Sequence, residues 1–127
     1  MAQPLTININ AIIQIESSGN PTAYNEGEIA IGLMQIRPCV VQDWNKAHPN
    51  DKHAIEDMFI PRINVKVGTW YLTARIPQMI KAYRKAVTIE NIIIAWNAGI
   101  KYVRNGRTPK STKRYLKRYF TGKGGEY

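Results

Sequence analysis

The chain has 127 residues, of which 44% are hydrophobic, and this composition is ordinary for a single globular domain. Its formal net charge is +9, and its one cysteine, Cys39, excludes an intrachain disulfide. No stretch approaches the roughly 20 apolar residues that cross a bilayer, which excludes a membrane-spanning helix.

The first predicted element is a helix over about residues 6–18. Ile9, Ile12 and Ile13 follow helical spacing there, and Glu16 comes at its end. Gly19 can end the helix in a left-handed turn. The residues able to cap its start are Thr6, Asn8 and Asn10.

Loop and helix signals alternate in the next fifty residues. Residues 19–31 are rich in Gly, Asn, Pro and Glu and predict a loop, with a short extended piece at 28–31. Prolines favour the first turn of a helix. They therefore predict helices over about 38–47 and 61–74.

The last third is predicted to be helical as well. Pro77 kinks or breaks the preceding helix, and helix resumes over 78–86. Thr88 is the expected cap of a helix through Ala98, which Gly99 ends. A basic loop over 102–110 leads to a last helix over 111–120.

These elements predict a mainly α fold, one domain of about six helices with at most a small β element. The domain is expected to cover residues 1–120, with 121–127 as a flexible basic tail. Residues 101–127 hold nine basic residues and one acid. Such a region attracts polyanions, among them nucleic acid, anionic lipid and acidic polymers of the cell envelope.

Glu16 has an unusual predicted setting. A carboxylate in the last turn of a helix is disfavoured by the helix dipole, and Ile12, Ile13 and Ile15 surround it with apolar surface. Both effects raise the pKa of a carboxyl group. A carboxylic acid that stays protonated near neutral pH can donate a proton to a leaving-group oxygen, so Glu16 is a candidate general acid. An isolated glutamate at a helix end is otherwise simply solvated.

Five short motifs stand in a meaningful order. They are ESSGNP at 16–21, GLMQI at 32–36, VGTWYL at 67–72, AWNAG at 95–99 and PKSTKRY at 109–115. In this order the set resembles the motifs of the lysozyme-like lytic transglycosylases, the catalytic domain of the soluble lytic transglycosylases. One motif alone is weak evidence, but the ordered set covers most of the chain.

The resemblance implies a lysozyme-like fold with a groove for glycan strands. It implies cleavage of the β-1,4 bond between N-acetylmuramic acid and N-acetylglucosamine in peptidoglycan, without a cofactor. Glu16 would protonate the glycosidic oxygen and then accept the proton of the sugar's own C6 hydroxyl, which closes onto C1 to leave a 1,6-anhydro end. A single acid then suffices, whereas ordinary glycosidases need two carboxylates. Glu26 and Glu28 are the other acids that the loop could bring towards the groove.

The resemblance also implies the residues that contact the substrate. Gln35 offers an amide to sugar groups, and Met34 offers an adaptable apolar contact. Trp96 replaces the family's tyrosine and either stacks on the sugar or packs internally. Ser111 stands where many members carry a glutamate. The full set of expected contacts is Ser17, Asn25, Met34, Gln35, Trp96, Asn97 and Tyr115.

Two alternatives remain open from the sequence. A goose-type lysozyme would hydrolyse the same bond, and a basic virion or nucleic-acid-binding protein would keep the fold without activity. The basic region favours anionic envelope polymers over nucleic acid as a partner. No metal site is expected, because His48 and His53 lie in a polar loop without a convincing set of ligands.

The start of the chain, MAQPLTININ, does not read as a secretory signal peptide. A protein that acts in the periplasm or cell wall would then be phage-delivered, virion-associated or separately exported. A phage-encoded protein fits this expectation.

Overall fold

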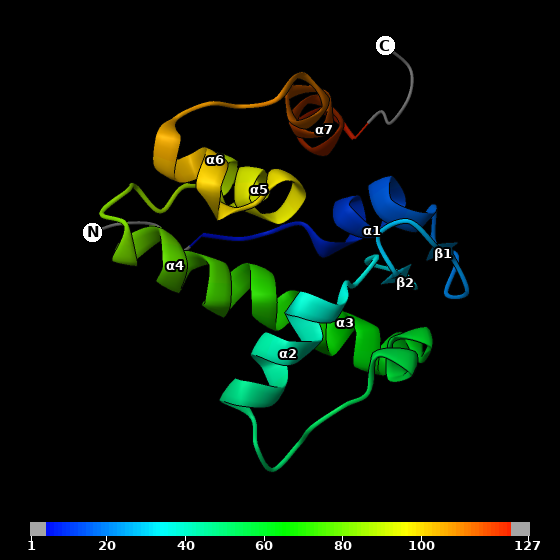
Figure 1. Ribbon diagram of the computed structural model, residues 1–127. Coiled ribbons are helices and arrows are strands. Elements are labelled where there is room, and N and C mark those ends of the chain that lie inside the picture. Colours follow the sequence, from blue (N-terminus) through cyan, green and yellow to red (C-terminus); the bar gives the residue numbers. More distant parts are fainter. Residues whose placement is uncertain (1–4, 123–127) are drawn as a thin grey trace. The chain divides into compact units, whose positions relative to one another are not determined.

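The computed structural model describes residues 5–122, which form helices and one small sheet (Figure 1). Their contacts define two compact units. Residues 12–71 form the hairpin unit, and residues 5–11 together with 72–122 form the helical unit. The predicted mainly α fold with a small β element is confirmed.

The hairpin unit contains the sheet. Strands β1 (Tyr24–Asn25) and β2 (Ala30–Ile31) pair antiparallel, with Tyr24 opposite Ile31. The 3₁₀ helix η1 (Ile55–Phe59) contacts β2. The sequence analysis expected an extended piece at 28–31 but did not anticipate η1.

Two helices complete this unit. Helix α2 (Pro38–Ala47) contacts α3 (Pro61–Trp70), and α3 also contacts η1. Both helices begin at the predicted prolines, since proline fits the first turn, where its missing N–H has no intrahelical acceptor. The buried apolar residues of the unit include Ile12, Ile31, Met34, Ile36, Val40, Trp44, Met58 and Val67.

The helical unit is built around α5 (Ile89–Ala98). This helix contacts α4 (Ile76–Ala82), α6 (Ile100–Asn105) and α7 (Lys110–Thr121) (Figure 1). Its sequence, IENIIIAWNA, is apolar enough to be covered on several sides. The buried apolar residues of this unit include Leu72, Ile76, Ile80, Ile92, Ile93, Trp96, Val103, Tyr115 and Tyr119.

Several predicted helix ends are confirmed and two predictions are wrong. Thr88 Oγ1 accepts the N–H of Asn91 at 3.1 Å, and Gly99 ends α5 with φ of 108°. Residues 100–105, most of them assigned to a basic loop, form α6 instead. Helix was also predicted to continue to residue 86, but α4 ends at Ala82. Pro77 lies in the first turn of α4, directly after the π-helix η2 (Tyr71–Arg75).

The last helix ends one residue after its predicted end at residue 120. Helix α7 ends at Thr121, and Gly122 follows with a left-handed φ of 67°. The predicted flexible tail, apart from its first two residues, falls at 123–127, which lie outside the described residues. Within residues 5–122, every helix is too short or too polar to cross a bilayer.

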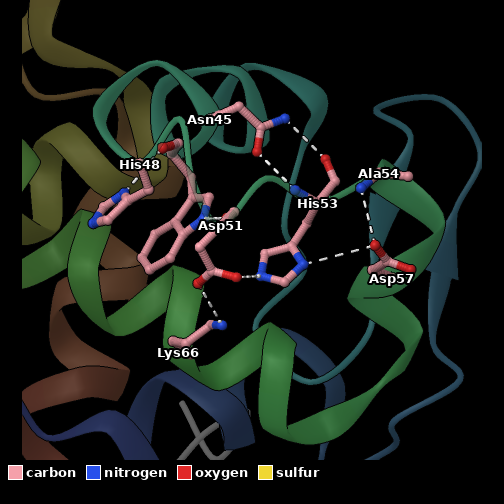
Figure 2. Close-up of polar contacts among 8 residues, drawn as sticks. Asn45, His48, Asp51, His53, Ala54, Asp57 and Lys66 are labelled. Atoms are coloured by element: carbon pink, nitrogen blue, oxygen red, sulfur yellow. Dashed lines mark hydrogen bonds and ion pairs between the residues drawn. The ribbon is translucent and has the colours of Figure 1, made fainter.

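The loop at residues 48–54 is fastened to α2 by polar contacts (Figure 2). Trp44 Nε1 donates to the backbone oxygen of Asp51 at 2.7 Å. The Asn45 side chain makes two hydrogen bonds of 2.8 Å with the backbone of His53, one as donor and one as acceptor. These bonds satisfy backbone groups that a loop would otherwise leave to water.

Both histidines of this loop take part in packing. The His48 ring stacks on Trp44 with 3.6 Å between ring centroids. The His53 ring lies between the carboxylates of Asp51 and Asp57, at 3.5 and 3.7 Å (Figure 2). Both rings are thus held by neighbours within the hairpin unit.

Replacing Lys66 with methionine (Lys66→Met) is expected to destabilise the protein at neutral pH but not in acid. Lys66 Nζ donates to Asp51 Oδ2 at 3.0 Å, and this hydrogen bond is the main cause that lowers the pKa of Asp51 below its ordinary value. A carboxylate with a lowered pKa in the folded state stabilises the fold above its unfolded pKa of about 3.9, and the contribution is lost as the pH falls. Urea unfolding at a series of pH values measures the effect.

The urea midpoints of Lys66→Met and the wild type should differ at pH 7 and converge in acid. Lys52→Met provides the matched control, since Lys52 is an exposed lysine in the loop that contains Asp51. Its midpoint should follow the wild type at every pH. A difference for Lys66→Met that stays constant down to acidic pH would assign the effect to packing on Trp44, whose ring centroid lies 5.4 Å from Nζ.

The residue that precedes helix α3 is a poor N-cap. Ile60 is the N-cap, and its side chain has no oxygen to accept a backbone N–H. It is also 44% exposed, so it gains little from burial. Ile60→Asp is therefore expected to raise the free energy of unfolding by about 1 kcal/mol, measured by urea denaturation. Ile60→Ala removes the apolar side chain without adding a cap, and an aspartate variant no more stable than this alanine variant would refute the capping argument.

Candidate active site

Glu16 lies in the last turn of α1 (Ile9–Ser17), as predicted. Asn8 Oδ1 accepts the N–H of Ala11 at 3.0 Å, which confirms the expected N-cap. Ser18 and Gly19 follow with left-handed φ of 54° and 80° and end the helix. Its last turn contains no basic residue, so the dipole at this end is not offset from within the helix.

Ser17 joins this helix end to the GLMQI segment. Its hydroxyl donates to the backbone oxygen of Leu33 at 2.7 Å and also lies 3.2 Å from the oxygen of Ile13. The residues around Leu33 form a tight loop, closed by two hydrogen bonds of 3.0 Å between the backbones of Ile31 and Ile36. The loop is thereby held against the turn that carries Glu16.

The side chain of Asn64 also holds this loop, through hydrogen bonds to its backbone. It is completely buried on α3, and its Oδ1 accepts the N–H of Met34 at 3.0 Å. Its Nδ2 donates to the backbone oxygens of Ile31 and Met58, each at 2.9 Å. The sequence analysis missed this residue. The available signal was a polar side chain between Ile63 and Val67, on the face of the helix that must be buried.

Gly32 is required by this arrangement. Its φ is 77°, and a Cβ there would overlap the backbone oxygen of Met58 and come within 2.5 Å of Asn64 Nδ2. Its N–H donates to the oxygen of Ala23 at 2.8 Å, which joins the loop to the hairpin. Only a residue without a Cβ permits this close approach of the backbone to Met58 and Asn64.

Gln35 uses its amide nitrogen within the loop. Nε2 donates to the backbone oxygens of Ala23 and Gly32, at 3.2 and 3.1 Å. The Gln35 backbone has a left-handed φ of 52°, so the residue adopts a strained conformation to reach this position. Its Oε1 accepts no hydrogen bond from residues 5–122 and is the part of the amide that can accept one from a sugar hydroxyl.

Met34 does not lie where the sequence analysis expected. Its side chain is 0% exposed, and a Cβ on Gly68 would come within 2.5 Å of its Sδ. The flexible thioether fills the space left by this glycine. The expectation of a substrate contact by the Met34 side chain is therefore corrected to a packing role.

Asn25 is exposed at the end of β1. Its Nδ2 donates to Glu28 Oε2 at 3.2 Å, and its Oδ1 accepts the N–H of Glu28 at 3.4 Å. Arg37 Nη1 lies 4.0 Å from Glu28 Oε1. Glu28, one of the two spare acids of the loop, is thus engaged within the hairpin.

The three remaining predicted site residues belong to the helical unit. Trp96 Nε1 donates to the hydroxyl of Tyr115 at 3.1 Å, and both side chains are buried. Burial and this bond favour the packing interpretation of Trp96. Asn97 Oδ1 accepts the hydroxyl of Thr112 at 2.7 Å. Thr112 is 1% exposed and was missed, although it stands in the fifth motif, three residues before Tyr115.

Known proteins have similar sequences and folds. The family model described as Transglycosylase SLT domain matches residues 6–119. The membrane-bound lytic murein transglycosylase E of Buchnera aphidicola subsp. Acyrthosiphon pisum (strain APS) is 32% identical over 93 residues, which are 72% of this chain and 42% of that protein. The 70 kDa soluble lytic transglycosylase of Escherichia coli aligns with a TM-score of 0.65 and 26% identity, over 90% of this chain and 22% of that one.

The chain spans less than half the length of either of these relatives. The family model nevertheless covers almost all of this chain, including all five motifs between residues 16 and 115. On this match, the chain belongs to the transglycosylase SLT domain family.

Proposed function

We propose that this protein is a peptidoglycan lytic transglycosylase that cleaves the β-1,4 bond between N-acetylmuramic acid and N-acetylglucosamine. The observation that carries the proposal is the bond from Ser17 to the backbone of Leu33. It fastens the GLMQI loop to the helix turn of Glu16, inside a chain that belongs to the SLT domain family. The names of two relatives, a lytic murein transglycosylase and a soluble lytic transglycosylase, support the same reaction.

Glu16 acts twice in the proposed reaction. It first gives its proton to the glycosidic oxygen as the bond from C1 to that oxygen breaks. The resulting carboxylate then accepts the proton of the C6 hydroxyl, whose oxygen forms a new bond to C1 of the same sugar. The enzyme regains its proton, no water is consumed, and a 1,6-anhydro end remains. An intramolecular hydroxyl replaces an activated water because it is already held next to C1.

The other residues of the proposal bind the substrate or hold neighbouring side chains in place. Gln35 Oε1 and Asn25 meet sugar hydroxyl or acetamido groups, while Ser17 orders the turn of Glu16. Within the helical unit, Asn97 has only its amide nitrogen left for a ligand, since its oxygen accepts the hydroxyl of Thr112. The buried pair of Trp96 and Tyr115 supports Asn97 from within the helical unit.

Product analysis tests the reaction type. Mass spectrometry of muropeptides released from purified sacculi should find 1,6-anhydro-N-acetylmuramic acid ends, because the nucleophile belongs to the substrate. Reducing ends, heavier by one water, would instead indicate a hydrolase of the goose-type lysozyme kind. The absence of any released muropeptide would favour a non-catalytic protein on this fold.

The site of action that we propose is the cell wall, reached by phage delivery, virion association or separate export. Residues 101–122 hold eight basic side chains and no acid, spread over α6, α7 and the loop between them. This basic surface attracts anionic polymers of the envelope and weakens with salt. Retention on sacculi that falls as salt rises supports the proposal, whereas preferential retention on duplex DNA at equal salt would favour nucleic acid.

A further inference from the structure

Two aromatic rings lie exposed together in the hairpin unit. Tyr24 on β1 and Phe59 at the end of η1 have ring centroids 6.4 Å apart, with their planes inclined by 42°. Their exposed fractions are 53% and 38%. Aromatic side chains are normally used to fill a core, and these two instead form an open platform next to each other.

The platform is joined to the Glu16 region through the backbone. Ala23, the residue before Tyr24, accepts hydrogen bonds from the N–H of Gly32 and from Gln35 Nε2. The loop that contains these two residues is held in turn by Ser17. All of these residues lie in one compact unit, so the platform has a fixed position relative to the end of α1 that carries Glu16.

Two residues beside the platform are locally unfavourable for folding. Ile29, in the hairpin turn, has a φ of 53°, a conformation that is strained for a β-branched side chain. Ile60, next to Phe59, is an exposed N-cap without a capping oxygen. Departures from local preference concentrate at functional surfaces, and here one lies in the turn after β1 and the other directly after Phe59.

We propose that Tyr24 and Phe59 form a stacking platform for a pyranose ring of the glycan strand, outside the two sugars that flank the cleaved bond. The proposal rests on the proposed function for its substrate. The C–H groups on the face of a pyranose carry partial positive charge and match the negative face of an aromatic ring. Asn25, which follows Tyr24 on β1 and is exposed, adds a polar side chain beside the rings, although both ends of its amide already contact Glu28.

A sugar fits this surface better than a protein partner does. Stable protein interfaces bury about 800 Å² on each partner and use 20 to 30 residues, which is far more than two rings and their neighbours supply. A single sugar needs only one or two aromatic faces with a few polar groups around them. The platform therefore contributes to the length of glycan that the protein holds.

The test measures glycan binding apart from cleavage. In the Glu16→Gln background, Tyr24→Ala and Phe59→Ala should each weaken binding of the chitooligosaccharide hexamer about tenfold, or about 1.4 kcal/mol, in calorimetric titration. Binding of the disaccharide should not change. Tyr24→Phe should bind the hexamer like the Glu16→Gln parent, since stacking requires the ring and not the hydroxyl.

Tyr83→Ala is the matched control, because Tyr83 is a similarly exposed aromatic in the helical unit. It should bind like the parent. Equal hexamer affinity for the parent and both alanine variants would overturn the platform, and so would a Tyr24→Phe variant as weak as Tyr24→Ala. Circular dichroism confirms that each variant is folded.

Kinetics separate this proposal from the proposed function. With Glu16 intact, Tyr24→Ala should raise KM for long glycan strands and leave kcat unchanged, the signature of lost uniform binding. A protein that binds the hexamer through Tyr24 but releases no muropeptides would retain the platform and refute the enzyme. Release of anhydro ends with the wild-type KM for long glycan strands in both alanine variants would refute the platform alone.

Discussion

Replacing Glu16 with glutamine (Glu16→Gln) is expected to lower the release of muropeptides from purified sacculi by about a thousandfold, within the range that a positioned acid or base contributes. Glutamine keeps the shape of the side chain but can neither donate the proton to the leaving oxygen nor accept one from the C6 hydroxyl. The fold should survive, because glutamine has nearly the same size and shape as glutamic acid and places no charge at the C-terminal end of the helix. Release is measured by chromatography of soluble products, and folding by thermal unfolding.

A substitution at Glu26, in the hairpin, is the control for the single-acid mechanism. Glu26 is the exposed acid that lies nearest to Glu16 along the chain, and it takes no part in the contacts described for Glu28. Glu26→Gln should release muropeptides at the wild-type rate, whereas an enzyme that relied on a second carboxylate there would be disabled. A Glu16→Gln variant that kept more than a tenth of the wild-type rate would remove Glu16 from the mechanism.

Replacing Asn64 with leucine (Asn64→Leu) is expected to lower the free energy of unfolding by about 3–5 kcal/mol, since it leaves buried polar groups without partners. The N–H of Met34 and the carbonyls of Ile31 and Met58 all lose their hydrogen bonds in one substitution. Urea denaturation gives the magnitude. Muropeptide release should fall as well, because the loop beside the Glu16 turn loses its anchor.

Asn50→Leu is the corresponding surface change, made in the exposed part of the loop after α2. It should alter the free energy of unfolding by less than about 0.5 kcal/mol. If Asn64→Leu cost no more than this control, the buried amide would not be the anchor that its three bonds indicate.

Local signals accounted for most of the helix boundaries. Pro38 and Pro61 begin helices, Thr88 caps one and Gly99 ends one, because each acts through its own backbone or its nearest neighbours. The setting of Glu16 was predictable for the same reason. Its position in the last turn depends only on Asn8 at one end of α1 and the left-handed residues 18 and 19 at the other.

Features that depend on distant partners were missed or misassigned. Residues 102–105 were predicted to belong to a basic loop, yet Val103 is buried and α6 packs against α5, so tertiary contact overrides the local pattern. Met34 belonged to a recognisable motif, but only its contact with Gly68 shows that the side chain faces inward. Asn64 and Thr112 each serve a residue at least 15 positions away, which no local window can reveal.

The bond between the Trp96 indole and the Tyr115 hydroxyl makes two motif positions interdependent. A tyrosine at position 96, the usual residue of the motif, carries its donor at a different distance from the backbone and would not reproduce this bond. Consensus engineering that restores tyrosine at position 96 would therefore take this donor away from the Tyr115 hydroxyl, and the substitution carries a cost that the motif alone does not reveal.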